Sequence, residues 1–355
     1  MLAPHFSGRD GDHAYIRTTA LLGFHELVER IGGDPDALLR MADIAAGPLH
    51  DIGGLMSFRR YVDLHEISAR ELNRPAFALE WVRATPSHFP NLGPLAYLGY
   101  FATDIREWAE TGLCYWRLHC NGFTMQLFED IEGPDAIFRY RHLMPSLPMR
   151  QATERTLGNI VELTRVIGNH PDKNPTLVRF QHARPRDISL HEAMFRCPLE
   201  FDAEHSEILF DKEALDYKTV GAIKLPRTVL GFYIRSRLRA MPIYDQTMKA
   251  TVELAVAGVI GTRRCNVQFV SDSLGLTPKK LQRLLAEEGT SFSDILDDAR
   301  RAAAIRMVKR SNAPIANIAS LLDYSSTPAF ILAFKRWMRM SPTKFRRSGT
   351  TSTAA

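Results

Sequence analysis

The sequence predicts two domains of different fold class, an α+β domain at the N-terminus and an all-α domain at the C-terminus. Three observations support this. The chain has 355 residues, enough for two or three domains. Mixed helix and strand patterns give way to helical patterns alone near residue 240. The helical part contains a weak internal repeat. Hydrophobic residues make up 45% of the chain and charged residues 24%, a globular balance.

Charge is distributed unevenly along the chain. Residues 241–355 carry 6 Lys and 11 Arg against 9 Asp and Glu, a net charge of +8, whereas the preceding residues sum to −3. All 12 histidines lie before residue 206. A basic segment joined to a near-neutral body suggests a module that binds a polyanion, although a solvated basic surface explains the charge equally well.

The cysteines favour a reducing compartment. Cys114, Cys120, Cys197 and Cys265 are scattered and form no C-x-x-C pair. No apolar run approaches the roughly 18 residues of a membrane span, and no signal peptide is recognisable. We therefore expect a cytoplasmic protein with no membrane segment.

The N-terminal domain is expected to mix helices and strands. Residues 15–110 read as mostly helical, with a stop at Gly32-Gly33 and a restart at Asp34-Pro35. The further elements expected in chain order are short strands within 116–145 broken at Asn121-Gly122 and Gly133-Pro134, a helix over 153–169, a strand within 174–185, a short helix over 191–197 and a strand within 206–215.

The domain boundary is placed where this mixed texture ends. We expect the α+β domain to span residues 1–240 and the all-α domain to span residues 245–348. The segment 239–246 is the expected linker, and residues 349–355 are expected to form a disordered tail.

Two segments of the helical part resemble each other, residues 270–285 and 318–334. Each begins with a short helix, continues through a turn that ends in Ser or Thr, and finishes with a helix that has Pro in its first turn. A hydroxyl caps such a second helix, and Pro is tolerated there. This is the pattern of a helix-turn-helix, and two copies indicate it more strongly than one.

Equivalent residues of the two copies lie 48 positions apart. Ser271 and Ala319 are small residues that allow the two helices of each copy to cross closely. Gly275 and Asp323 occupy the same place in the two turns.

A single helix is expected between the copies, over residues 291–311. It would fix the two units relative to each other, about 34 Å apart if both second helices enter successive major grooves. Arg300 and Arg306 are equally compatible with structural pairing and with DNA backbone contact, and Asp297-Asp298 are expected on the solvent face. The apolar stripe consists of Phe292, Ile295, Leu296, Ala299, Ala303 and Met307.

The segment from about 250 to 348 resembles the DNA-binding domain of AraC/XylS-type transcription regulators. The resemblance rests on LGLTPKKLQRLLAEEGTSFSDILDDAR and IANIASLLDYSSTPAFILAFKRWMRMSPTKFR. It implies two helix-turn-helix units joined by a linker helix. The closing pattern that carries it is Phe330, Phe334-Lys335, Trp337, Ser341-Pro342 and Phe345-Arg346.

The N-terminal portion is similar to the "arabinose-binding" type of regulatory domain of the ornithine-utilisation-regulator subgroup. The matching stretches are GGDPDALLRMA, YVDLHEISARELNRPAFALEW and AMFRCPLEFDAEHSEILFD. The name of that domain type implies nothing about arabinose for this chain.

The chain departs from the family pattern in its second unit. The family usually has Gly at the position of Asp323, Arg at the position of Leu332 and a polar residue at the position of Ile331. An apolar side chain contacts a thymine methyl but cannot make the bidentate bond of Arg to guanine. The i, i+4, i+7 spacing indicates that three aromatic residues belong to the core of the second unit itself: Phe330, Phe334 and Trp337.

The predicted DNA contacts fall into two groups, and solvated surface is the alternative for Lys279, Gln282 and Arg283. Residues expected to reach base edges are Lys279, Gln282, Arg283, Ile331 and Leu332. Residues expected to contact the backbone, which positions a protein without specifying sequence, are Lys280, Ser326, Thr327, Lys335 and Arg336.

No catalytic, metal or cofactor motif is recognisable. Three His-Glu dipeptides occur, but the fourth residue after each His is Glu29, Ala69 or Phe195, so none forms a zinc-protease helix. Cys114, His119 and Cys120 are more typical of buried side chains in strands than of a metal site. The sequence contains no phosphate-binding glycine loop, and we expect no enzyme activity, metal or cofactor.

The resulting hypothesis is a sequence-specific transcription regulator controlled by a small-molecule effector on its N-terminal domain. The expected partners are double-stranded promoter DNA, RNA polymerase, an unknown effector and a second copy of the chain. Two alternatives stay open, a ligand-independent dimeric DNA-binding regulator and an enzyme carrying a DNA-binding tail. The sequence identifies neither the effector-binding residues nor the operator, and does not distinguish activation from repression.

Overall fold

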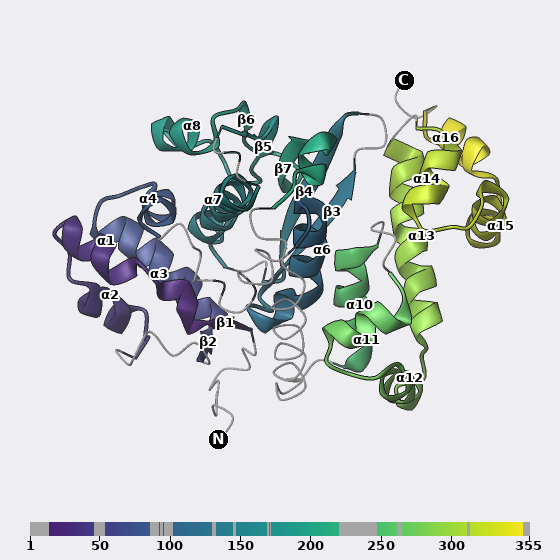
Figure 1. Cartoon of the computed structure of the whole chain (residues 1–355), viewed down its shortest axis with the longest axis horizontal. Coiled ribbons are helices and arrows are strands. Elements are labelled where there is room, and N and C mark those ends of the chain that lie inside the picture. Colours follow the sequence, from purple (N-terminus) through teal and green to yellow (C-terminus); the bar gives the residue numbers. More distant parts are fainter. Residues whose placement is uncertain are drawn as a thin grey trace.

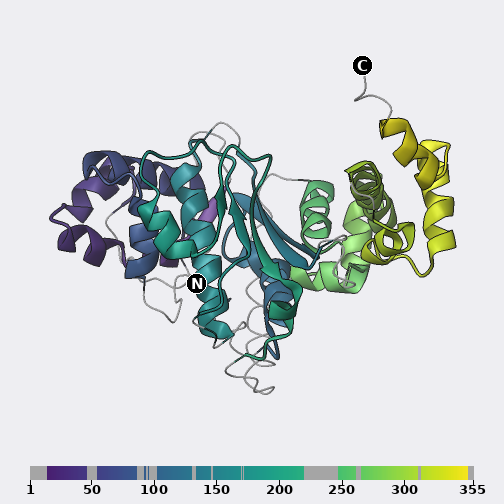
Figure 2. The same ribbon diagram turned by 90° about the horizontal axis from the view of Figure 1, so that it is seen from above.

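The structure is a computed structural model, and it describes residues 14–45, 54–85, 92, 95, 102–129, 133–144, 147–168, 170, 172–219, 247–260, 265–310 and 313–350. Within these residues no helix is both long and apolar enough to cross a membrane. A helical layer lies at one end of the molecule, a β-sheet lies in the middle, and a purely helical part lies at the other end (Figures 1 and 2). The predicted fold class, α+β followed by all-α, is confirmed.

The N-terminal helical layer contains several short helices, one of which begins with a side-chain cap. The Asp34 side chain accepts a hydrogen bond from the Ala37 N–H (3.0 Å), and Pro35 begins the helix that follows. The helices of the N-terminal part are α1 (Phe24–Arg30), α2 (Pro35–Met41), α3 (Phe58–Glu71), α4 (Phe77–Ala84), α6 (Ile105–Tyr115), α7 (Arg150–Ile167) and α8 (Ser189–Phe195). The 3-10 helices are η1 (Thr18–Leu21), η3 (Trp116–Leu118) and η4 (Lys212–Asp216).

Two sheets complete this part of the chain. Strands β1 (Tyr15–Arg17) and β2 (Leu55–Ser57) form a small antiparallel pair. The larger sheet has the order β3-β4-β7-β5-β6, and every pairing in it is antiparallel except β5 with β6. Its strands are β3 (Phe123–Glu129), β4 (Asp135–His142), β5 (Leu177–Arg179), β6 (Leu199–Glu200) and β7 (Ser206–Asp211).

The C-terminal part consists of helices alone among the described residues. They are α10 (Met248–Val259), α11 (Val267–Ser273), α12 (Pro278–Glu287), α13 (Phe292–Arg310), α14 (Ile315–Leu321), α15 (Thr327–Met338) and α16 (Pro342–Thr350). Helices α11 and α12 form the first helix-turn-helix unit, and α14 and α15 form the second. Each unit has its own apolar core, and α13 contributes to both. With 19 residues, α13 is about 28 Å long.

The two turns have the same backbone geometry. Gly275 and Asp323 both adopt positive φ, 68° and 57°. In each unit the next residue donates its N–H back across the turn, Leu276 to Ser271 O (2.8 Å) and Tyr324 to Ala319 O (3.0 Å). These bonds close a helix through a left-handed residue. The predicted equivalence of Gly275 and Asp323 is therefore confirmed.

The C-terminal part packs against one edge of the larger sheet. Helix α10 contacts β3, which is an edge strand, and also α6; α11 contacts α6 as well. A cleft of about 510 Å³ lies beside this contact, lined on one side by strand residues such as Arg139 and Glu207 and on the other by α13 and α14 residues such as Arg306 and Leu321.

Several local predictions need correction. The helix expected from residue 15 is wrong at its start, because β1 and η1 occupy Tyr15–Leu21 and Gly23, at φ 78°, separates them from α1. Trp116–Leu118 form a 3-10 turn instead of a strand, so Cys114 and His119 do not lie in a strand setting. Helix α16 extends to Thr350, two residues into the expected tail. The expected linker, residues 239–246, lies outside the described residues.

Asp323 is expected to tolerate glycine and to reject a β-branched residue, because its φ of 57° lies in the left-handed region. Asp323→Gly should leave the Tm of the full-length protein unchanged or raise it, whereas Asp323→Val should cost about 1–2 kcal/mol. Thermal unfolding of both variants measures this. Ala302→Val is the matched control, since it places the same side chain in right-handed helix at an exposed position and should cost only about 0.5 kcal/mol. Equal losses for the two valine variants would contradict the prediction.

Candidate functional site

Helix α12 presents a polar face to solvent. The Thr277 hydroxyl caps it by accepting from the Lys280 N–H (3.2 Å), and Leu281 and Leu285 bury the opposite face. The four predicted contact residues on this helix are all exposed: Lys279, Lys280, Gln282 and Arg283. The Arg283 side chain lies 3.8 Å from Glu287, one turn further along the helix.

Helix α15 presents a different face. Phe330 and Phe334 are fully buried, and Trp337 packs against the same cluster, so the prediction that these aromatics form the unit's own core is confirmed. Leu332 is 73% exposed. Ile331 is half-buried against the core.

The remaining predicted contact residues lie at the two ends of α15. Ser326 is exposed and caps the helix, with its Oγ accepting from the Ala329 N–H (3.3 Å), and Thr327 is the first helical residue. Lys335 and Arg336 are exposed in the last turn. Polar groups therefore flank the exposed Leu332 along the helix.

The linker helix holds α15 through an acidic residue. Asp297 accepts from Arg336 Nη2 (2.7 Å) with one carboxylate oxygen and from Trp337 Nε1 (2.9 Å) with the other. Asp297 was expected on the solvent face; it instead joins α13 to α15. Only Asp298 behaves as expected, pairing with Arg301 at an exposed position (2.9 Å).

Arginines of α13 and α16 make structural contacts. Arg300 Nη2 donates to the Asp323 carbonyl (3.0 Å), and its guanidinium lies 4.9 Å from the centroid of the Tyr324 ring. Arg346 donates to the Val308 carbonyl (3.2 Å) from Nε and to the Ala313 carbonyl (2.7 Å) from Nη2. For Arg300, the structure favours the structural alternative.

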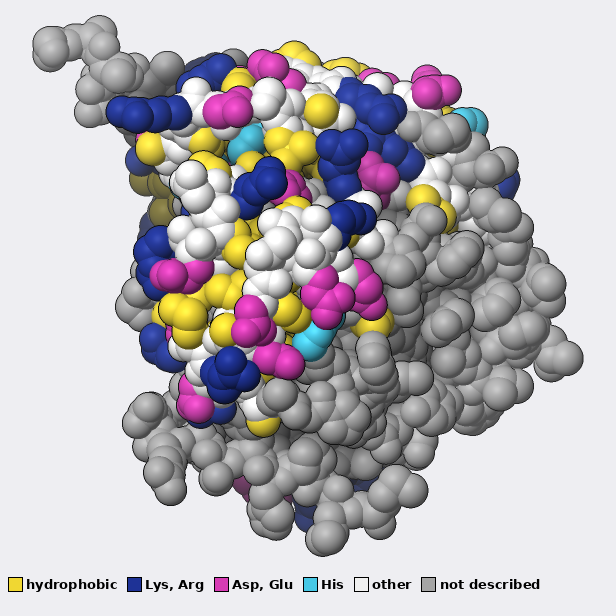
Figure 3. All heavy atoms as spheres, turned by 90° about the vertical axis from the view of Figure 1, so that its left-hand side faces the viewer, with side chains coloured by type: hydrophobic (Ala, Val, Ile, Leu, Met, Phe, Trp, Pro, Cys, Tyr) yellow, Lys and Arg dark blue, Asp and Glu magenta, His cyan; other side chains and the backbone are white. Residues whose placement is uncertain are grey.

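The opposite end of the molecule has a mixed surface. On the face formed by its N-terminal helices, Lys and Arg side chains lie beside Asp and Glu (Figure 3). The excess of positive charge belongs to the helical C-terminal part, where the exposed residues of α12 and α15 lie.

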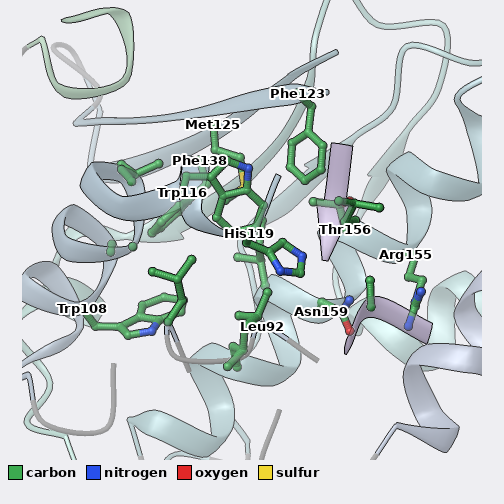
Figure 4. A pocket seen from close by; sticks show the side chains of 18 of the residues that line it. Leu92, Trp108, Trp116, His119, Phe123, Met125, Phe138, Arg155, Thr156 and Asn159 are labelled. Carbon is green, nitrogen blue, oxygen red and sulfur yellow. The ribbon is translucent and has the colours of Figure 1, made fainter. Parts of the chain in front are cut away.

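A second candidate site is a cavity of about 70 Å³ in the N-terminal part. Helix α7 lines one side of it with Arg155, Thr156 and Asn159, and Trp108 and Trp116 lie on the other side (Figure 4). The other lining residues are largely apolar: Ile16, Ala20, Tyr61, Leu92, Leu95, Ala109, Gly112, Leu113, His119, Phe123, Met125, Phe138, Ile160 and Leu163. An apolar cavity with a few polar groups is the usual form of a small-molecule site.

This cavity was not among the features predicted from the sequence. A usable signal was present in α6 and the turn after it, where Trp108, Gly112 and Trp116 recur every four residues. A glycine between two tryptophans on one helix face leaves a gap, and a Cβ added at Gly112 meets no atom within 4 Å. No group of three or more metal-ligating side chains lies together among the described residues.

Comparison with known families matches both parts of the chain. The profile described as the arabinose-binding domain of AraC transcription regulators, N-terminal, matches residues 32–219, and a helix-turn-helix domain profile matches residues 270–348. The chain belongs to the AraC family of transcription regulators. It is a transcription regulator with a helix-turn-helix DNA-binding domain, as the sequence resemblance implied.

Proteins similar to this AraC-family chain are named as transcriptional regulators. It is 27% identical over 338 residues to the HTH-type transcriptional regulator VirS of Mycobacterium tuberculosis, covering 95% of this chain and 98% of VirS. It is 27% identical over 176 residues to VqsM of Pseudomonas aeruginosa, covering 46% and 50% of the two chains. The crystal structure of CdpR from Pseudomonas aeruginosa aligns with 88% of this chain and 96% of CdpR, at 16% identity and a TM-score of 0.41.

Asp297 is expected to stabilise the second helix-turn-helix unit of the regulator. Asp297→Ala removes both acceptors and leaves the half-buried Trp337 indole N–H unpaired, at a cost of about 1–2 kcal/mol. Asp298→Ala removes only an exposed ion pair and should stay within about 0.5 kcal/mol of wild type. The measurement is chemical denaturation of the full-length variants. Both alanines gain the same helix propensity, so a difference between them reports the contact with α15, and no difference would argue against it.

Proposed function

We propose that this AraC-family protein is a sequence-specific, effector-controlled regulator. In this proposal α12 and α15 contact promoter DNA, and the cavity in the N-terminal part binds a small molecule that changes the affinity for DNA. The observation that carries it is the wall that the cavity shares with the helical C-terminal part. Helix α6 and strand β3 line the cavity with Trp108, Gly112 and Met125, and the same two elements contact α10 of the helical part.

Such sharing matters because an effector alters DNA affinity only if it binds two arrangements of the protein differently. A ligand that displaces side chains of α6 or β3 acts directly on the surface that holds α10. The route to the first helix-turn-helix unit then runs through α10 and α11, which pack against α6.

The roles proposed on DNA follow from exposure. Lys279, Gln282 and Arg283 of α12 are exposed donors that suit base edges in the major groove. On α15, Leu332 is the main candidate for an apolar base contact, and Ile331, being half-buried, has less surface to offer. For the backbone we propose Lys280, Ser326, Thr327, Lys335 and Arg336.

The remaining parts of the proposal concern organisation. We propose that residues 1–240 and 245–348 form separate domains and that the protein acts in the cytoplasm as a homodimer. Two-fold symmetry matches paired half-sites in an operator. RNA polymerase is the proposed protein partner at the promoter. DNA affinity that no small molecule changes would favour a ligand-independent dimeric regulator.

The two helix-turn-helix units are expected to contribute unequally to sequence reading. Arg283→Ala should remove about 1–3 kcal/mol of discrimination at one base pair, if the contact is bidentate to guanine. Leu332→Arg should add a preference for guanine in the other half of the site, whereas Leu332→Ala should change little. Selection of binding sites from random DNA with the full-length variants measures this.

Lys280→Ala is the matched control for Arg283→Ala, because both residues are exposed cations of α12. Losing a phosphate contact should weaken binding about equally for all sequences and reduce the slope of log affinity against log salt by about 1. If Arg283→Ala keeps the preferred sequence while Leu332→Ala erases it, the proposed roles are reversed.

Filling the cavity at Gly112 is expected to uncouple DNA binding from the effector. Gly112→Leu places a side chain in the open space beside Trp108 without disturbing the helix, and it gains helix propensity. Any metabolite that raises the Tm of the wild type should change its DNA affinity, as measured by fluorescence anisotropy, but should have no effect on Gly112→Leu. Gly112→Ala is the control that leaves most of the cavity open. A ligand response that survives in Gly112→Leu would place the effector elsewhere.

A further inference from the structure

The cavity contains a buried positive charge. Arg155, in the middle of α7, is 1% exposed, and among the described residues no carboxylate lies within ion-pair distance of it. A buried charge without a partner is costly, and proteins usually pair it. Because Arg155 lies at the wall of a cavity, the negative group that pairs with its charge can be supplied by a bound molecule.

The orientation of the Arg155 guanidinium is fixed by two neighbours. Its Nη1 donates to the Tyr61 hydroxyl (2.7 Å), and its Cζ lies 3.4 Å from the centroid of the Trp81 ring. The nitrogens without partners are Nε and Nη2. These two form one edge of the guanidinium, the edge that binds a carboxylate through two parallel hydrogen bonds.

Other polar atoms of the cavity wall also have no hydrogen-bond partner in the structure. They are His119 Nδ1, Asn159 Oδ1 and Trp116 Nε1. Burial, followed by the charges of Arg17 and Arg155, lowers the pKa of His119 to about 3. His119 is therefore neutral at physiological pH, and Arg155 is the only charged side chain among the described residues that line the cavity.

We infer that the cavity binds a compact, largely apolar monocarboxylate whose carboxylate pairs with the Nε and Nη2 edge of Arg155. This inference rests on the proposed function and names the chemical class of its effector. The cavity has a volume of about 70 Å³, and one water needs about 10–15 Å³. This size favours a small ligand over one with a long chain. The aromatic and aliphatic walls favour a ligand that is largely apolar.

Two other ligand classes fit this wall less well. A neutral hydrophobic molecule would leave the Arg155 charge unpaired. A phosphate ester carries close to two negative charges at neutral pH, and Arg155 alone would compensate only one of them. A monocarboxylate matches the single charge and leaves no excess in the cavity.

The test uses the full-length protein and pairs of probes that differ only in charge. The pairs are benzoate with benzamide, phenylacetate with phenylacetamide, and hexanoate with hexanamide. Binding is followed by thermal shift and by quenching of the fluorescence of Trp108 and Trp116. At least one carboxylate is expected to bind the wild type about 10- to 100-fold more tightly than its amide, the range for charge-assisted hydrogen bonds.

Arg155→Met should abolish the preference for the carboxylate while keeping apolar packing against Trp81. Arg155→Lys, which keeps the charge without the two-pronged edge, should retain only part of it. Arg83→Met is the control, because Arg83 is an exposed arginine on α4, and it should bind like wild type. If Arg155→Met does not fold, the wild type with its paired probes and Arg155→Lys still decide the matter.

Three results would overturn the inference: an amide that binds the wild type as tightly as its carboxylate, carboxylate binding unchanged in Arg155→Met, or no binding by any of the six probes. The proposed function is judged separately by DNA affinity. An amide that binds and alters DNA affinity would leave effector control standing and remove the anion site. A carboxylate that binds through Arg155 without changing DNA affinity would leave the anion site standing and remove effector control through it.

Discussion

Much of the N-terminal helix packing in this regulator centres on the buried guanidinium of Arg155. Helices α3, α4 and α7 meet there, because α3 supplies the Tyr61 hydroxyl and α4 supplies the face of Trp81. The other face of Trp81 lies against His65, with ring centroids 4.8 Å apart. Burial, and next the nearby Arg155, lowers the pKa of His65 to about 3. Among Tyr61, His65, Trp81 and Arg155, the charged group is therefore Arg155, and His65 stays neutral at physiological pH.

This arrangement brings the charge close to the part of the molecule that binds DNA. The cavity at Arg155 is walled on its far side by α6 and β3, and the outer surfaces of those elements hold α10 and α11. Packed elements of this kind shift as units, since protein interiors are nearly incompressible. In the proposed function, a ligand in the cavity would therefore have a short mechanical route to the first helix-turn-helix unit. The second unit is joined to the first by α13, which shares its core with both units.

The sequence predicted the helical part in more detail than the N-terminal part, and the reasons are local. Caps, turn residues and apolar spacing repeat 48 positions apart, so each copy supported the interpretation of the other. The comparison even predicted that Asp323 occupies the same turn position as Gly275, and both have positive φ. The burial of Arg155 carried no such signal, because arginine is usually exposed and TERTLGNI reads as an ordinary helix. Asp297 was misplaced for a similar reason. Its contact partners, Arg336 and Trp337, lie about 40 positions away, and no spacing rule connects residues that meet only through tertiary packing.

The two recognition helices show how a chain can keep a fold while altering its surface. In α15 the aromatic residues that hold the helix are retained and buried, and Asp297 fixes its orientation from α13. The outward face is then free to vary, and it carries Leu332, the most exposed large apolar side chain among the described residues. Leucine at 73% exposure buries little of its surface on folding, so most of that surface is available for burial against a partner. A thymine methyl in the major groove is an apolar surface of suitable size. In the proposed function, α12 would supply hydrogen bonds to the bases from its polar donors and α15 would supply an apolar contact, with α13 packed against both units between them.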